Sequence, residues 1–172
     1  MKPDTMKHRL IVLRHAKADR GPMPDHERPL TGRGRRDSLA AGRWLADGGF
    51  RPDLTVCSTA ARARETWALA AVELGEPVPT TYERGVYEAD LDDLLQIVHE
   101  TPDEVRTLLL VGHNPGFQDL VLELTGESEG DTLVAARTDF GTAAVAVLAL
   151  RGPWADAGPG HGTLTQFVVA RG

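Results

Sequence analysis

The stretch Arg9-Leu10-Ile11-Val12-Leu13-Arg14-His15-Ala16 decides the fold of this chain. Its four consecutive apolar residues, 10–13, are typical of a buried strand. This strand ends on a basic residue and an imidazole, Arg14 and His15, placed side by side. Open α/β sheets bind their ligands beyond the carboxyl ends of their strands. The sequence therefore predicts a functional site at the end of this strand.

The composition is that of an ordinary globular protein. The 172 residues are 41% hydrophobic and 26% charged, without an apolar run long enough to cross a bilayer. The net charge of −6, from 19 basic and 25 acidic residues, argues against a nucleic-acid partner. The single cysteine, Cys57, excludes an internal disulfide and suits a reducing compartment. We expect a cytoplasmic protein with a disordered tail over residues 1–7 and one domain over 8–172.

Apolar runs alternate with amphipathic segments along the whole chain. Strands are predicted at 8–14, 53–58, 78–81, 107–111, 142–150 and 163–169, and helices at 31–47, at 60–73, after Asp90 and from Pro115 to 124. Loops are predicted at 17–29, 82–89 and 126–131. This alternation implies right-handed crossovers and a mainly parallel sheet covered on both faces, with the last two strands at one edge. The fold class is therefore three-layer α/β/α.

Two further strand ends carry residues of the same kinds as Arg14 and His15. Arg62 and Arg64 follow the strand at 53–58, and helical geometry separates their directions by roughly 200°, so only one can face the site. Arg62 is nearer the strand and is the candidate. His113 follows the strand at 107–111, with Asn114 predicted as the N-cap of the next helix and Pro115 as its first residue. Three strand ends then converge on one crevice.

These residue types suit the binding and transfer of a phosphoryl group. Two guanidinium groups supply forked donors for its oxygens, and a helix N-terminus adds backbone N–H groups. A neutral imidazole is a competent nucleophile for phosphorus. The set indicates a phosphatase pocket that needs no metal and no cofactor. The alternative for each residue is structural: Arg14 and Arg62 paired with acids such as Asp19 or Glu65, and both histidines acting as capping groups.

Other kinds of functional site have weaker support in this sequence. A thiol phosphatase needs Cys-x5-Arg, but four and six residues separate Cys57 from Arg62 and Arg64, so Cys57 is predicted to be a small buried hydrophobe. Gly32-Arg33-Gly34 lacks the pattern of a nucleotide-binding loop and is better explained by helix packing. The remaining histidines show no metal-ligand spacing and are predicted at the surface; they are His8, His26, His99 and His161.

Four motifs in order resemble the histidine phosphatase superfamily, and in particular its SixA-like phosphohistidine phosphatases. The motifs are Leu-Arg-His at 13–15, Arg-Pro-Leu-Thr at 28–31, Cys-Ser-Thr-Ala-Ala-Arg-Ala-Arg-Glu-Thr at 57–66 and Gly-His-Asn-Pro at 112–115. The resemblance spans residues 10–150 and implies a phosphoglycerate mutase-like fold. It further implies that His15 is the phosphorylated nucleophile, that Arg14, Arg62 and His113 form the phosphate pocket, and that Arg28 lies at its rim. Asn114, at the helix start, would also face the substrate.

The sequence departs from the superfamily at two points that bear on the substrate. Ala16 replaces the glycine of the common Arg-His-Gly opening, and Ala is small enough to keep the site. The general acid has only positional candidates, Glu83 and Glu88. An alkoxide leaving group needs a proton, whereas imidazole, with a pKa of about 6.5, leaves more readily.

The partner expected is thus a phosphorylated substrate, with a phosphohistidine-bearing protein preferred. The alternatives are a small-molecule phosphomonoesterase or phosphoglycerate mutase-like enzyme, and a non-catalytic module that binds a phosphorylated ligand.

Overall fold

The computed structural model of the chain describes residues 8–172. Its centre is one sheet with the strand order β3-β2-β4-β1-β6-β7-β5. The strands are β1 (His8–Arg14), β2 (Leu54–Ser58), β3 (Thr80–Glu83), β4 (Thr107–Gly112), β5 (Thr125–Ser128), β6 (Ala144–Leu150) and β7 (Gly162–Val169). Only β6 runs antiparallel to its neighbours, β1 and β7. The sheet is therefore mainly parallel, as predicted.

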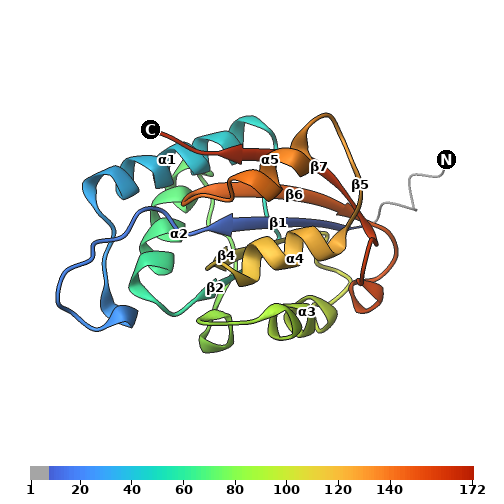
Figure 1. Cartoon of the computed structure of the whole chain (residues 1–172), viewed down its shortest axis with the longest axis horizontal. Helices are drawn as coiled ribbons and strands as arrows, with labels where there is room; N and C mark the ends of the chain where they lie inside the picture. The colour runs from blue at the N-terminus through green and yellow to red at the C-terminus, as the bar shows by residue number, and fades with distance from the viewer. Residues whose placement is uncertain (1–7) are drawn as a thin grey trace.

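Five helices cover the two faces of this sheet (Figure 1). They are α1 (Gly32–Asp47), α2 (Ala61–Glu73), α3 (Leu91–His99), α4 (Gly116–Leu124) and α5 (Thr132–Thr138). Alternate residues of β1 point to opposite faces: Leu10 and Val12 pack with α3, α4 and α5, whereas Ile11 and Leu13 pack with α1 and α2. This arrangement confirms the three-layer α/β/α class.

Local signals fix where several helices begin and how closely they pack. The Thr31 side chain caps α1 by accepting a hydrogen bond from Gly34 N–H, and Asp90 forms a reciprocal capping box with Asp93 at the start of α3. Gly42 brings α1 so close to the Ala70 backbone of α2 that a Cβ atom would clash there. Among the described helices, none is long and apolar enough to cross a membrane.

Three expectations about elements far from the site were wrong or shifted. The polar loop predicted at 126–131 instead contains most of β5, and α5 follows it. β5 has the polar sequence Thr-Gly-Glu-Ser and pairs only with β7, so its strand form comes from tertiary pairing rather than from an apolar pattern. β5 rather than β7 therefore forms the edge. β3 lies at 80–83 rather than 78–81, and the tail predicted at 1–7 falls outside the described residues.

Candidate active site

The carboxyl ends of β1, β2 and β4 meet at one cavity of about 470 Å³. His15 directly follows β1, and its backbone N–H donates to the carbonyl of Gly112, the last residue of β4. His113 follows β4, and the two imidazole rings lie 5.2 Å apart between centroids. Six residues predicted for the site line this cavity: Arg14, His15, Arg28, Arg62, His113 and Asn114.

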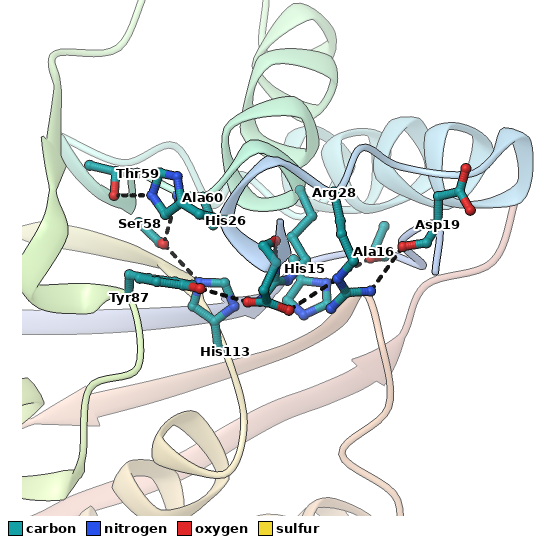
Figure 2. A network of polar contacts seen from close by, with 12 residues as sticks. His15, Ala16, Asp19, His26, Arg28, Ser58, Thr59, Ala60, Tyr87 and His113 are labelled. Carbon is teal, nitrogen blue, oxygen red and sulfur yellow. Dashed lines mark hydrogen bonds and ion pairs between the residues drawn. The ribbon is translucent and has the colours of Figure 1, made fainter. Parts of the chain in front are cut away.

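His15 is held as a neutral imidazole with one nitrogen free. The side chain is buried, and Nδ1 lies 2.7 Å from the carbonyl oxygen of Ala16 (Figure 2). Because a carbonyl only accepts, Nδ1 carries the proton and the lone pair remains on Nε2. Burial lowers the pKa of His15 to about 4, and the nearby guanidinium groups of Arg14 and Arg62 act in the same direction. Nε2 is therefore available as a nucleophile at neutral pH.

Ser58, at the end of β2, sets the tautomer of His113. The hydroxyl oxygen of Ser58 accepts from Ala60 N–H and lies 2.7 Å from Nε2 of His113 (Figure 2). Among the described residues, Nε2 is the only acceptor within hydrogen-bond distance of the Ser58 hydroxyl, so we assign the hydroxyl proton to this contact and the imidazole proton to Nδ1. Burial, with the neighbouring His15, lowers the pKa of His113 to about 3. His113 thus presents a neutral N–H donor.

Two guanidinium groups are anchored by hydrogen bonds to the protein, and each keeps its Nε donor unpaired. Arg14 donates through Nη1 to the carbonyl of Phe140, at 3.0 Å. Arg62 donates through Nη1 to the carbonyl of Asp25 and through Nη2 to the carboxylate of the same residue, at 2.7 and 3.1 Å. In both arginines Nε is buried without a hydrogen-bond partner, and so is Nδ1 of His113. Buried donors are rarely left unpaired, so these three atoms indicate an anion site beside His15.

Asp25 is a component of the site that the sequence did not reveal. Its carboxylate accepts from Tyr87 Oη at 2.6 Å, from Arg62 and from Nε of Arg28 at 3.1 Å. The hydrogen bond from Tyr87 is the main reason why the pKa of Asp25 lies well below its usual range. Asp25 therefore stays anionic and holds Arg62 in place. The structural alternative had named Asp19 and Glu65 as partners of the arginines, but the ion pair of Arg62 is with Asp25.

Asn114 lies at the site in a different role from the one predicted. Pro115 takes the flanking position and α4 begins at Gly116, so neither the predicted N-cap nor the predicted first residue is right. The Asn114 amide donates to the same Phe140 carbonyl that holds Arg14, while its oxygen accepts from Gln118 N–H. Asn114 thus hydrogen-bonds to the first turn of α4 although it lies one residue before the N-cap position. Through the shared Phe140 carbonyl, it also connects this turn to Arg14.

The remaining candidates divide between the cavity and its surroundings. Arg64 lies outside the cavity, with its guanidinium 4.7 Å from the ring centroid of Tyr82, as the helical phase predicted. Glu83 is exposed and borders a separate cavity with Val56, and Glu88 is exposed and does not line the site. Neither Glu83 nor Glu88 therefore lines the cavity that contains His15.

Three side chains that were not predicted to form the site differ in their burial and contacts. Cys57 is buried, and burial raises the pKa of its thiol to about 12, which confirms it as a hydrophobe rather than a nucleophile. His8 was predicted at the surface but is 4% exposed, because its ring bonds to the carbonyl oxygens of Gly152 and Asp103. His26 is half-buried, bonding to Thr59 and meeting the Tyr87 ring edge-on. Across residues 8–172, no group of three or more His, Cys, Asp or Glu is placed to hold a metal ion.

The lowered pKa values of His15 and His113 predict acid-sensitive stability. In the unfolded chain an imidazole has a pKa of about 6.5, whereas in the folded chain the pKa of His15 is about 4 and that of His113 is about 3. Between the unfolded and the folded pKa of each histidine, the unfolded chain therefore binds more protons than the folded one. The free energy of unfolding must then fall as pH falls through this window. Each histidine should remove about 2 kcal/mol between about pH 7.5 and pH 5.

Urea unfolding in buffers without phosphate or sulfate measures this effect. The variant His15→Gln should lose about 2 kcal/mol less than the parent protein over the same pH interval. An equal loss in both proteins would show that His15 titrates normally in the folded state.

Comparisons with known proteins place this site in a family. The model of the histidine phosphatase superfamily (branch 1) matches residues 10–132. An uncharacterized protein of Mycobacterium tuberculosis is 38% identical over 162 residues, which cover 92% of this chain and 100% of the relative.

Two solved structures share the whole fold. A candidate phosphohistidine phosphatase SixA from Nakamurella multipartitia has a TM-score of 0.82 and 33% identity, covering 95% of this chain and 96% of its own. A second candidate SixA, from Agrobacterium tumefaciens, has a TM-score of 0.79 and 30% identity, covering 94% and 97%. Because the family model matches residues 10–132 and these two structures have the same fold, this chain belongs to the histidine phosphatase superfamily.

Proposed function

We propose that this protein is a phosphatase that works through a phosphohistidine at His15. Nε2 attacks phosphorus, the bond from phosphorus to the leaving group breaks, and the leaving group departs with the electron pair. Water then attacks the phosphoryl group, the P–N bond breaks, and the electron pair returns to Nε2. The observation that carries this proposal is the set of three buried, unpaired donors beside His15: Nε of Arg14, Nε of Arg62 and Nδ1 of His113.

The same donors explain how the charge of the transferring group is stabilised. Phosphoryl transfer needs positioning and stabilisation of negative charge on the equatorial oxygens more than covalent assistance. Arg14 and Arg62 are held from behind by Phe140 and Asp25, so their geometry is set before the substrate binds. The two guanidinium groups supply positive charge that other phosphatases obtain from metal ions. We therefore propose that turnover is independent of divalent metal.

We further propose that the substrate is a phosphohistidine, carried by a protein. The side chains that line the cavity include no Asp or Glu within the described residues, and the nearby Asp25 stays anionic under its hydrogen bonds. A site of this kind offers a leaving group little acid assistance. An imidazole leaving group needs less of it than an alkoxide does. The names of the two SixA neighbours, which are candidate phosphohistidine phosphatases, support this choice.

Parallel assays in excess chelator test this proposal. One peptide sequence is prepared with phosphohistidine and with phosphoserine at the same position, and an aryl phosphate and 3-phosphoglycerate are assayed beside them. The phosphohistidine peptide should be hydrolysed with a kcat/KM at least about 10²-fold above that of the phosphoserine peptide, because general-acid assistance is worth that much or more. Chelator should leave the rate unchanged.

Each other outcome identifies a different function. Equal turnover of the two peptides would indicate a general phosphomonoesterase, and isomerisation of 3-phosphoglycerate would indicate a mutase. Binding of the phosphohistidine peptide without hydrolysis would indicate a binding module. Loss of turnover in chelator, restored by a divalent ion, would contradict the metal-independent chemistry.

A further inference from the structure

The cavity is larger and more positively charged than one phosphoryl group requires. Its volume of about 470 Å³ falls in the range that holds whole small-molecule ligands. The three buried, unpaired donors belong to Arg14, Arg62 and His113, which line the cavity together with His15. Beyond them, four cationic side chains line the same cavity without having been assigned a role: Lys17, Arg20, Arg33 and Arg171.

The charges at this outer part of the cavity are only partly balanced. Arg33 and Arg171 share one buried carboxylate, Asp37, at 3.4 Å from each. Lys17 and Arg20 are exposed and form no ion pair with any acid in residues 8–172. The chain as a whole is acidic, with a net charge of −6. An uncompensated positive cluster in an acidic protein attracts anions to that place.

Two of the outer cations, Arg33 and Arg171, are also anchored by the fold. Asp37 accepts from the Gly172 backbone N–H as well as from Arg171, which ties the C-terminal segment to α1. Arg171 donates through Nη1 to the carbonyl of Thr142, at 2.9 Å. Gly34 of α1 packs directly on the Lys17 backbone, so Lys17 lies beside the first turn that carries Arg33. Arg33, Arg171 and the backbone of Lys17 are thus positioned before a ligand arrives.

We propose that Lys17, Arg20, Arg33 and Arg171 form a second anion site, which binds a carboxylate or a second phosphate that the substrate carries close to its phosphoryl group. The inference rests on the proposed function, because it takes the inner donors as the phosphoryl site. It goes further in stating that the preferred substrate is at least doubly anionic. Charge-assisted hydrogen bonds to such a group would add affinity that a singly anionic substrate does not gain.

Binding of two phosphonates of equal length tests the second site without any turnover. Propylphosphonate carries only the phosphonate, whereas 3-phosphonopropionate adds a carboxylate at the far end. Calorimetry on the parent protein should show 3-phosphonopropionate binding about tenfold tighter or more. The double variant Lys17→Met/Arg33→Gln should bring the two dissociation constants to within about twofold of each other. Arg171 and Asp37 remain paired in this variant, which preserves the local structure.

A matched control separates the local site from the overall charge. The double variant Arg36→Gln/Arg64→Gln removes two exposed cations that do not line the cavity, and it should keep the tenfold preference. Equal affinity of the parent protein for the two phosphonates would overturn the second site alone. Failure of both phosphonates to bind would overturn the phosphoryl pocket and the second site together.

A pair of phosphohistidine peptides identifies the source of the second anion. The peptides carry Glu or Gln beside the phosphohistidine. A preference for the Glu peptide that the Lys17→Met/Arg33→Gln variant loses would assign the site to an acidic side chain of a protein substrate. A preference confined to 3-phosphonopropionate would assign it to a small, doubly anionic phosphate compound. Both results support the second anion site, whereas equal affinity for the two phosphonates overturns it whatever the peptides show.

Discussion

The variant His15→Gln is expected to lose all covalent phosphorylation and at least about 10⁴-fold of turnover, as removal of a nucleophile does in other enzymes. Glutamine is close to histidine in length and can still donate to the Ala16 carbonyl, but its amide has no lone pair that can attack phosphorus. The three buried donors remain in the variant, so phosphate binding should persist. The variant therefore separates binding from chemistry.

Mass mapping after incubation with a small phosphoryl donor measures this effect. Digestion under alkaline conditions preserves phosphohistidine, and the label of the parent protein should lie on the peptide that contains His15. His99→Gln is the control, because His99 is exposed and contacts only the Ala157 carbonyl through its ring. This control should label normally. A label on His113, or turnover that survives in His15→Gln, would exclude the proposed intermediate.

The core of the fold and the main site residues follow from local sequence patterns. The apolar runs at 10–13 and 107–111 form adjacent parallel strands, β1 and β4, paired in register from Arg9 with Thr107 to Arg14 with Gly112. This register brings the residues that follow each strand, His15 and His113, to the same end of the sheet. The helical phase of α2 likewise distinguishes buried Arg62 from Arg64 without any tertiary information.

The parts that sequence reasoning missed depend on contacts between distant segments. Asp25 lies in a proline-rich loop that has no periodic pattern, and it meets Tyr87 from 62 residues away. Ser58 ends β2 as an ordinary polar residue, and only its 2.7 Å approach to His113 gives it a role. β5 is a polar strand formed by pairing with β7. Such contacts arise from the packing of the whole chain and leave no signal in a short window of sequence.

The tautomers of the two histidines also could not be predicted from the sequence. Arg14-His15 and Gly112-His113 indicate which residues meet, but not which nitrogen of each ring is free. That choice is made by the Ala16 carbonyl at His15 and by the Ser58 hydroxyl at His113. The first contact leaves a lone pair on Nε2 and the second leaves a proton on Nδ1. The two imidazoles therefore take different roles, nucleophile and donor, although both are neutral.

The substitution Arg62→Ala is expected to lower kcat/KM for the phosphohistidine peptide by about 10³-fold, in line with the loss of a transition-state donor or arginine elsewhere. It removes the Nε donor that faces the phosphoryl group and leaves the Asp25 carboxylate with one cationic partner fewer. Arg64→Ala, two residues along the same helix, should stay within about twofold of the parent protein. Steady-state kinetics on both variants measures the difference. A larger loss in Arg64→Ala would show that the orientation assigned to α2 is wrong.

Arg62→Lys distinguishes the geometry of Arg62 from its charge. Lysine keeps the positive charge but carries its three N–H donors on a single nitrogen. Arg62 uses Nη1 and Nη2 to bind Asp25 while Nε stays free for the ligand, and an ammonium group cannot reproduce the fixed positions of these three nitrogens. If the fixed fork is what stabilises the transition state, Arg62→Lys should remain about 10²-fold below the parent protein or lower. Near-complete rescue by lysine would mean that charge alone suffices, and that Asp25 does not act by positioning Arg62.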